Sequence, residues 1–148
     1  FAIDVDGDGD IDVLSASDDD TIAWYENEPR RLDEEIEFTK HFITTDADGA
    51  RAVFAIDVDG DGDIDVLSAS WNDDTIAWYE NDGNQGFVKR AITTDADGAE
   101  YAVFAIDVDG DDDIDVLSAS AGDGDGDIDV LSDDTIAWYE NDGNQGFT

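Results

Sequence analysis

The sequence predicts an all-β protein built from three successive antiparallel sheets of four strands, the last sheet incomplete. A unit of about 50 residues occurs three times along the 148-residue chain. Within each unit, apolar residues alternate with small or polar ones, and each run ends at Gly, Asp or Asn. Alternation with a period of two is typical of strands, and those three residue types are typical of turns. No stretch carries the apolar stripe of an amphipathic helix.

The repetition is nearly literal. Residues 1–17 (FAIDVDGDGDIDVLSAS) recur unchanged at 54–70, and recur at 104–120 with Asp112 in place of a glycine. Three further blocks repeat: TIAWYEN at 21–27, 75–81 and 135–141, NDGNQGF at 81–87 and 141–147, and ITTDADGA at 43–50 and 92–99. We therefore expect one repeat domain over residues 1–148, with units at about 1–45, about 46–94 and about 95–148.

Four strands are predicted in the middle unit. The first is the short apolar run 53–56, which ends at an acidic loop, and the second is the β-branched run 64–68. The third, 75–79, alternates small or polar with large side chains, and the fourth, 87–93, is of the same kind. Asn-Asp-Gly-Asn between the last two predicts a tight turn, because Gly83 can adopt a positive φ.

Two units depart from this pattern. In the first unit the turn is replaced by the longer, charged segment 27–38. In the third unit residues 121–132 (AGDGDGDIDVLS) form an insertion that copies the loop and second strand. We expect either a bulged excursion there or a shift in which copy serves as the second strand.

The acidic composition limits the classes of partner. The formal net charge is -36, and three divalent ions would still leave about -30. This argues against nucleic acid and anionic membrane surfaces, and suits a salty or calcium-rich medium. The chain has no cysteine, no run long enough to span a membrane and no signal-peptide pattern. Because it lacks methionine and begins inside a repeat motif, we expect a piece of a longer protein.

Each unit contains the cassette Asp-x-Asp-x-Asp-x-Asp-x-Asp, at residues 4–12, 57–65 and 107–115. Calcium takes six to eight oxygen ligands, and a curled loop can direct the carboxylates of its first, third and fifth residues inward. The seventh residue then offers its carbonyl, the ninth offers a carboxylate, and Gly62 at the sixth position permits the bend. The predicted ligands are Asp4, Asp6, Asp8, Asp10 and Asp12, then Asp57, Asp59, Asp61, Asp63 and Asp65, then Asp107, Asp109, Asp111, Asp113 and Asp115.

Other metal loops fit the cassette less well. An EF-hand needs an acid at its twelfth position and flanking helices, but Ser15, Ser68 and Ser118 stand there between predicted strands. A nonapeptide β-roll needs tandem spacing, and magnesium takes fewer carboxylates. A solvated acidic turn is the plain alternative, which three copies between identical strands disfavour.

The predicted sites are not equal. Asp112 stands where the first two loops have Gly9 and Gly62, and a positive φ there would strain the third loop. The insertion offers a fourth, weaker site without a carboxylate at its first position, Ala121. Its ligands would be Asp123, Asp125, the carbonyl of Asp127, and Asp129. We therefore predict three Ca²⁺ sites and a weaker fourth.

The units resemble the FG-GAP/VCBS repeats of integrin-α-like β-propellers, and the resemblance covers essentially the whole chain. Its most specific elements are the loop DVDGDGDID and the spaced strand TIAWYEN. The resemblance implies that each unit is a propeller blade whose first two strands are joined by the calcium loop, with the ligands just given. Closed propellers have four to eight blades, so three units imply a fragment or self-association, for example two chains making six blades.

Other candidate residues carry weaker signals. Trp24, Trp78 and Trp138 occupy one repeated strand position and are expected to pack between blades. Trp71 has no counterpart, and packing at the rim is favoured over stacking on a sugar. The Asp-Ala-Asp-Gly stretches at 46–49 and 95–98 are interpreted as turns between blades. His41 has neither a cysteine nor a recurring serine beside it, so we predict that the chain is not an enzyme.

The expected function is a calcium-stabilised, non-catalytic scaffold or adhesion module that is extracellular or on the cell surface. The alternatives are a carbohydrate-binding propeller, a self-assembling repeat polymer, and an accessory domain of a secreted polysaccharide-degrading enzyme. Expected partners are a second copy or the rest of a longer chain, and a protein or glycan ligand, with neither nucleic acid nor membrane insertion.

Overall fold

The computed structural model describes residues 1–28, 37–96, 102–120 and 135–148, and within them it contains eleven strands and no helix. The strands are β1 (Ala2–Ile3), β2 (Asp12–Ser17), β3 (Thr21–Asn27), β4 (Phe38–Thr44), β5 (Ala50–Ile56), β6 (Asp65–Ser70), β7 (Thr75–Asn81), β8 (Phe87–Thr93), β9 (Ala102–Ile106), β10 (Asp115–Ser120) and β11 (Thr135–Tyr139). In the described residues no helix is long and apolar enough to cross a membrane.

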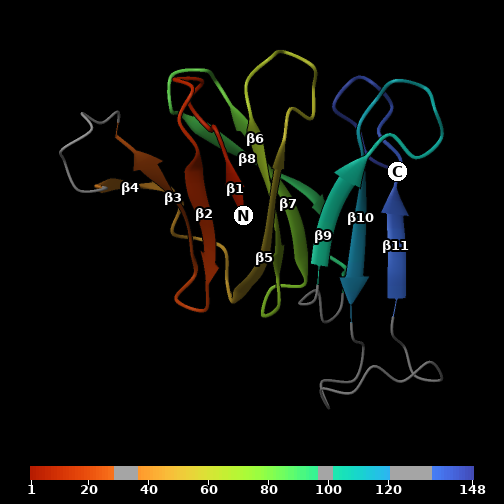
Figure 1. Ribbon diagram of the computed structural model, residues 1–148. Coiled ribbons are helices and arrows are strands. Elements are labelled where there is room, and N and C mark those ends of the chain that lie inside the picture. Colours follow the sequence, from red (N-terminus) through yellow and green to blue (C-terminus); the bar gives the residue numbers. More distant parts are fainter. Residues whose placement is uncertain (29–36, 97–101, 121–134) are drawn as a thin grey trace.

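The strands form three antiparallel sheets that follow one another along the chain (Figure 1). Their strand orders are β1-β2-β3-β4, β5-β6-β7-β8 and β9-β10-β11. In the third sheet a single bridge, Asn141 to Phe147, marks the place of the predicted fourth strand. The predicted all-β fold of three antiparallel blades, the last incomplete, is confirmed. All three acidic loops lie at the same end of the sheets, at the top of Figure 1.

The second and third strands pair in the same register in every sheet. Leucine lies opposite tryptophan and valine lies opposite tyrosine in each blade. The pairs are Leu14 with Trp24, Leu67 with Trp78, Leu117 with Trp138, Val13 with Tyr25, Val66 with Tyr79, and Val116 with Tyr139. Since successive side chains on a strand point to opposite faces, the Leu–Trp pair lies on one face of a blade and the Val–Tyr pair on the other.

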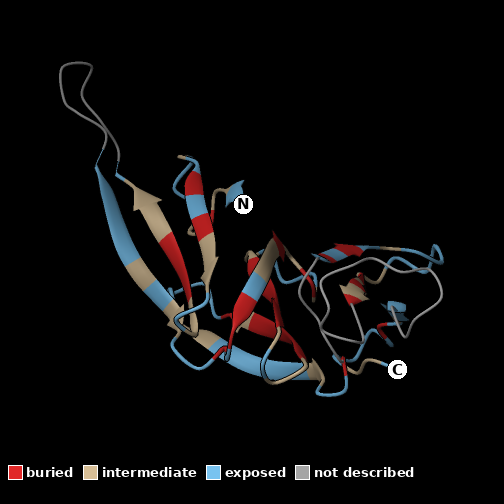
Figure 2. Cartoon of the chain, turned by 90° about the horizontal axis from the view of Figure 1, so that it is seen from below, coloured by how far each residue is buried: buried red, intermediate tan, exposed pale blue. Residues whose placement is uncertain are grey.

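The core lies between adjacent sheets. One cluster joins the Leu–Trp face of the first sheet to the Val–Tyr face of the second, and includes Leu14, Trp24, Val66 and Tyr79. The next cluster joins the second sheet to the third in the same way, and includes Trp78 and Val116. The inner strands β6 and β7 of the middle sheet are therefore buried on both faces, whereas the outer strands β4 and β8 are largely exposed (Figure 2).

The predicted turns at 46–49 and 95–98 connect one blade to the next; residues 97 and 98 lie outside the described part. The Ala47 N–H donates to the Asp20 carbonyl at 3.0 Å, and the Ala96 N–H donates to the Asp74 carbonyl at 2.9 Å. Within the first of these turns, the hydroxyl oxygen Oγ1 of Thr44 accepts the Asp46 N–H at 3.1 Å. Trp71 is half-buried, and its backbone N–H donates to the Gly49 carbonyl at 3.0 Å; packing of its side chain at the rim stays a prediction.

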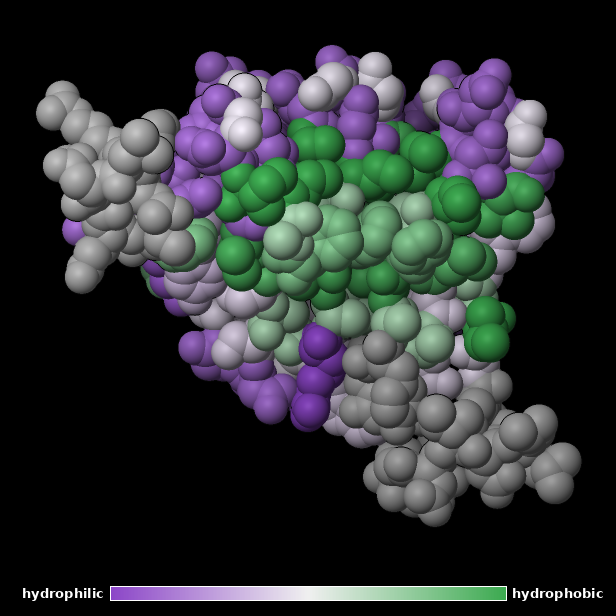
Figure 3. All heavy atoms as spheres, viewed as in Figure 1, coloured by the Kyte–Doolittle hydropathy of each residue, from purple (hydrophilic) through white to green (hydrophobic). Residues whose placement is uncertain are grey.

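The face seen in Figure 1 divides into a hydrophilic end and an apolar band. Figure 3 shows the hydrophilic side chains of the loops at the top and a continuous apolar band below them. Phe1, Phe54 and Phe104 form a row in this chain, with ring centroids 4.9 and 4.8 Å apart. Because these phenylalanines precede the acidic loops at one repeated position, the row runs from blade to blade.

Candidate metal centres

The acidic loops curl around their first aspartate. In the second loop Asp57 accepts the N–H groups of Gly60 at 2.8 Å and Gly62 at 3.0 Å. Asp4 and Asp107 accept the corresponding N–H groups at 2.7 to 3.2 Å. The curl requires a positive φ at the sixth position, where Gly62 has 101°. Asp112 adopts 75° at the same position, a conformation that costs a residue with a Cβ more than glycine.

Each loop brings three carboxylates together. The groups are Asp4, Asp6 and Asp8, then Asp57, Asp59 and Asp61, then Asp107, Asp109 and Asp115. Within each group one oxygen from every carboxylate lies within 4.8 Å of the others. Oxygens bound to one calcium ion at roughly 2.4 Å lie no further apart than about 4.8 Å. Each group of three carboxylates could therefore hold a hard divalent cation.

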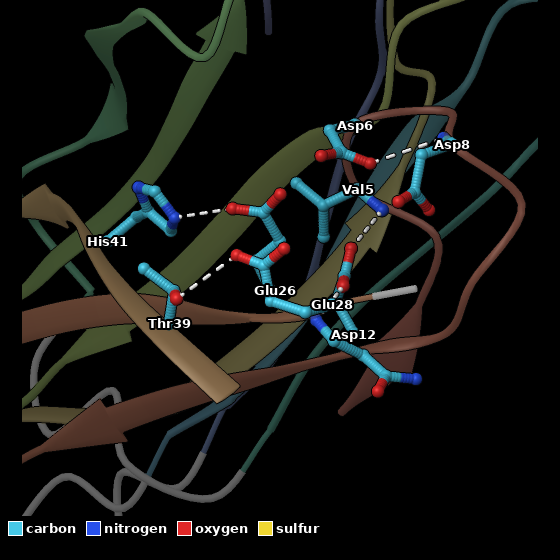
Figure 4. A network of polar contacts seen from close by, with 9 residues as sticks. Val5, Asp6, Asp8, Asp12, Glu26, Glu28, Thr39 and His41 are labelled. Atoms are coloured by element: carbon cyan, nitrogen blue, oxygen red, sulfur yellow. Dashed lines mark hydrogen bonds and ion pairs between the residues drawn. The ribbon is translucent and has the colours of Figure 1, made fainter. Parts of the chain in front are cut away.

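The ninth aspartate has a second task that the sequence did not reveal. Asp12, Asp65 and Asp115 are buried, and one oxygen of each accepts the N–H of the loop's second residue at 2.9 Å. The other oxygen accepts the N–H of Asn27, Asn81 or Asn141 at the end of the third-strand segment, at 2.8 to 2.9 Å. Figure 4 shows the Val5 contact of Asp12 together with the Asp6–Asp8 contact of the loop. This carboxylate ties the loop to the sheet in all three blades, and joins the carboxylate group only in the third.

The repeated asparagine was missed as part of the site, although it follows TIAWYE in every unit. Asn81 is buried, and its Nδ2 donates to the Ile64 carbonyl at 2.9 Å while its Oδ1 accepts the Gly83 N–H at 3.1 Å. Asn141 makes the same two bonds in the third blade. The side chain fastens the end of the acidic loop to the following turn.

The seventh aspartate lies at that turn. The N–H of Asp63 donates to Asp61 Oδ1 at 2.8 Å, and the N–H of Asp10 donates to Asp8 Oδ1 at the same distance. The carboxylate of Asp63 lies against Gly83, so that a larger residue at position 83 would have to displace this side chain. The φ of 70° at Gly83 favours glycine in the turn.

Within the described residues, no ion pair joins a carboxylate of the acidic loops to a protein cation. In the described residues the ion pairs involve Asp18, Glu26 and Glu80, which lie outside the loops. Burial is the largest cause that raises the pKa of Asp59, and the neighbouring Asp61 carboxylate adds to it. Burial raises the pKa of Asp6, Asp109 and Asp113 as well. A bound cation would favour the ionised form of each of these groups.

The pKa of Asp65 is strongly raised. Burial raises its pKa from 3.8 to about 6, against the opposing N–H groups of Asn81 and Val58. The indole N–H of Trp78 lies close enough to Asp65 to lower its pKa. The geometry between the two groups is not that of a hydrogen bond, and the buried Trp78 Nε1 has no hydrogen-bond partner among the described residues. The buried carboxylate is thus held by neutral donors alone.

Polar pockets lie between adjacent blades, beside the loops. The first, of about 370 Å³, is lined by residues that include Asp6, Asp8, Trp24, Asp63, Asn84 and Gln85. The second, of about 290 Å³, is lined by their counterparts, including Asp59, Asp61, Trp78, Asp113, Asn144 and Gln145. Gln145 Nε2 donates to Asp59 Oδ2 at 3.3 Å, so one blade's turn touches the preceding blade's loop.

The repeated tryptophans differ between blades. Trp24 and Trp78 are each 1% exposed and pack between blades as predicted, whereas Trp138 is 44% exposed. The prediction of a core position was wrong for Trp138 because, in the described part of the chain, no further blade covers that face. His41 stacks on Trp24 with ring centroids 4.5 Å apart and contacts Glu26 at 2.7 Å (Figure 4). This histidine covers a core tryptophan.

The predicted fourth site cannot be placed, because Asp123, Asp125, Asp127 and Asp129 lie outside the described residues. The same holds for the prediction about the insertion at 121–132.

The comparison with protein families agrees with this architecture. A family profile described as FG-GAP-like repeat matches residues 4–68 and again residues 57–118. The chain belongs to the FG-GAP-like repeat family. Each match runs from the first aspartate of one loop into the second strand of the next blade. FG-GAP-like repeats are generally non-catalytic modules. No curated protein sequence matches the chain significantly.

Proposed function

We propose that this FG-GAP-like protein is a calcium-stabilised, non-catalytic scaffold or adhesion module that works outside the cell. The observation that carries the proposal is the threefold carboxylate cluster, with oxygens within 4.8 Å of one another in every blade. Family membership supports it, because FG-GAP-like repeats commonly bind calcium. The large number of carboxylates favours calcium over magnesium.

The role of calcium in this proposal is structural. The ion would be held by the first, third and fifth carboxylates in the first two blades, and by the first, third and ninth carboxylates in the third. It would cancel the repulsion within each loop and so fix the connection between a blade's first two strands. The ninth aspartate extends this effect to the third strand through its bond to Asn27, Asn81 or Asn141.

Thermal unfolding in calcium and in chelator tests the proposal. A ligand that binds only the folded state stabilises it by roughly 2.7 kcal/mol per site at a hundredfold excess over its Kd. We expect a higher melting midpoint in calcium, and a smaller calcium effect in the double variant Asp57→Asn, Asp59→Asn. Asp46→Asn is a matched control, because it removes a negative charge from an exposed residue outside the loops. A midpoint that calcium leaves unchanged would refute the proposal.

The extracellular part of the proposal rests on the family, whose repeats typically occur in extracellular proteins. The net charge of -36 is tolerated more easily where salt and calcium are abundant. Calcium titration by calorimetry should give dissociation constants near 10⁻⁴–10⁻³ M, the range of extracellular calcium modules. Submicromolar affinity in all loops would instead favour an intracellular calcium buffer or sensor.

Carbohydrate binding is a second candidate, favoured by the two polar pockets between blades. Their carboxylates and carboxamides suit the hydroxyl groups of a sugar, and their volumes of about 370 and about 290 Å³ suit a small ligand. A glycan array probed with the whole chain tests this. Loss of binding in Gln85→Ala and Gln145→Ala, with Trp71→Ala unaffected, would support the pockets. The opposite pattern would place the sugar at Trp71.

A further inference from the structure

The two junctions inside the chain use one pair of complementary surfaces. We define the forward face of a blade by its Leu, Ile and Trp side chains, such as Leu67, Ile76 and Trp78 of the middle blade. We define the backward face by its Val and Tyr side chains, such as Val66 and Tyr79. Both core clusters consist of a forward face packed on the backward face of the next blade.

The third blade leaves its forward face open. Ile22 and Ile76 are completely buried at the two junctions, whereas the equivalent Ile136 is 85% exposed. Leu117 is only half-buried, although Leu67 at the same position is completely buried. The side chains are identical in the three blades, so the exposed surface has the shape and chemistry of surfaces that are buried within the chain.

The first blade leaves the complementary face open. Val66 and Val116 are completely buried by the preceding blade, but the equivalent Val13 is 40% exposed. Its neighbour Ile11 is 56% exposed, whereas Ile64 packs into the core between the first two blades. The chain thus carries a forward face at one end and the backward face that matches it at the other.

The aromatic row ends in the same way. Phe54 lies between Phe1 and Phe104, while Phe1 and Phe104 are each 45% exposed. These two phenylalanines lie in the first and the third blade, so a blade added at either end would continue the row. An exposed apolar band such as the one on the face seen in Figure 3 is typical of an association surface.

We propose that two copies of this chain associate head to tail, with the forward face of each third blade on the backward face of the other copy's first blade. Two such junctions close a ring of six sheets, within the four to eight blades of closed propellers. A second copy is the occupant that the observations favour, because it offers the same complementary faces that already pack inside the chain. A pair with two equal junctions also has the twofold symmetry most common among oligomers.

The mass in solution is the first test. Sedimentation or light scattering of the whole chain in calcium and physiological salt should give twice the chain mass of 16.0 kDa. The same measurement in chelator and low salt should give a weaker association, because the charge of -36 per copy is then less screened. A mass of 16.0 kDa at every concentration, or an open series of higher masses, would overturn the closed pair.

Substitutions at the two open faces give a sharper test. Ile136→Asp and Val13→Asp should each abolish the doubled mass, because each places a charge in both junctions. Val88→Asp is the matched control, since Val88 is 55% exposed on the outer strand of the middle blade. Trp138→Glu serves as a second variant of the forward face should Ile136→Asp fail to fold, as judged by circular dichroism.

Mixing the variants distinguishes head-to-tail from face-to-face packing. In a mixture of Ile136→Asp and Val13→Asp, one junction retains two unchanged faces, so the doubled mass should partly return. If Val13→Asp alone stays at the doubled mass while Ile136→Asp does not, third blades pair with each other and the proposal is wrong. Failure of the calcium proposal is separate, because it shows as an unchanged melting midpoint and not as an unchanged mass.

Discussion

The middle and third blades share the sequences DVLSAS and TIAWYEN, yet their side chains have different surroundings. Ile76 and Trp78 of the middle blade are 0% and 1% exposed, whereas Ile136 and Trp138 of the third are 85% and 44% exposed. The second and third strands pair in the same register in both blades. Local sequence therefore determines the strands of a blade, whereas the neighbouring blade determines which of its side chains are buried and stabilise the protein.

The largest expected effect tests this difference directly. Trp78→Ala should lower the free energy of unfolding by about 3–5 kcal/mol, because it empties a core position between two blades. Trp138→Ala should lower it by less than about 1 kcal/mol. Both are made in the Val13→Asp chain, so that association does not bury Trp138, and are compared by urea unfolding in calcium. Equal losses would contradict the role assigned to the neighbouring blade.

Loss of a polar contact within a blade should cost the same stability in the middle blade as in the third blade. Asn81→Ala and Asn141→Ala each leave a loop carbonyl and a turn N–H without their partner, and each should cost about 1–3 kcal/mol. The bonds of Asn81 to Ile64 and Gly83 have counterparts at Asn141, so the two losses should be similar. Urea unfolding of both variants measures this. A loss confined to the middle blade would show that the loop anchors also depend on the adjacent blade.

A pH dependence is expected from the middle blade. The pKa of Asp65 is raised by burial from 3.8 to about 6, so the folded state holds a proton that the unfolded state has released. In chelator, the contribution of Asp65 to stability should therefore fall as pH rises from about 4 to about 6. Urea unfolding across this range measures it, and Asp65→Asn should flatten the profile while Asp46→Asn should not. A rise in stability that depends on Asp65 would contradict the assignment.

The smallest expected effect on stability comes from the sixth position of the acidic loops in the middle and third blades. Asp112 adopts a φ of 75° where the middle loop has Gly62, so Asp112→Gly should stabilise the chain by about 1 kcal/mol or less. The reverse change, Gly62→Asp at a φ of 101°, should destabilise it. Calcium titration of both variants should shift the affinity of the altered loop in the same direction. Unchanged unfolding and affinity in both would show that this position carries no strain.

Much of the blade could be predicted from the sequence because its causes are local. The alternation of side chains at 75–79 predicted strand β7, and Gly83 predicted the turn that follows this strand. Gly83 has the positive φ, 70°, that such a turn requires. The role of Asp65 could not be predicted in full, because its partner Asn81 lies 16 residues away and is reached only after the strands pair. The same limit applies to Trp138, since its exposure depends on what lies beyond the blade. The choice of Asp115 in the third carboxylate group depends on loop geometry that the pattern Asp-x-Asp does not contain.

The repeated register of the Leu–Trp and Val–Tyr pairs has a consequence for how such a protein evolves. Because every blade presents the same two faces, a gene rearrangement that adds or removes a whole unit recreates the junction that already packs inside the chain. Near-identical repeats also promote unequal recombination between copies. The length of this protein can therefore change in steps of one blade without the evolution of a new interface.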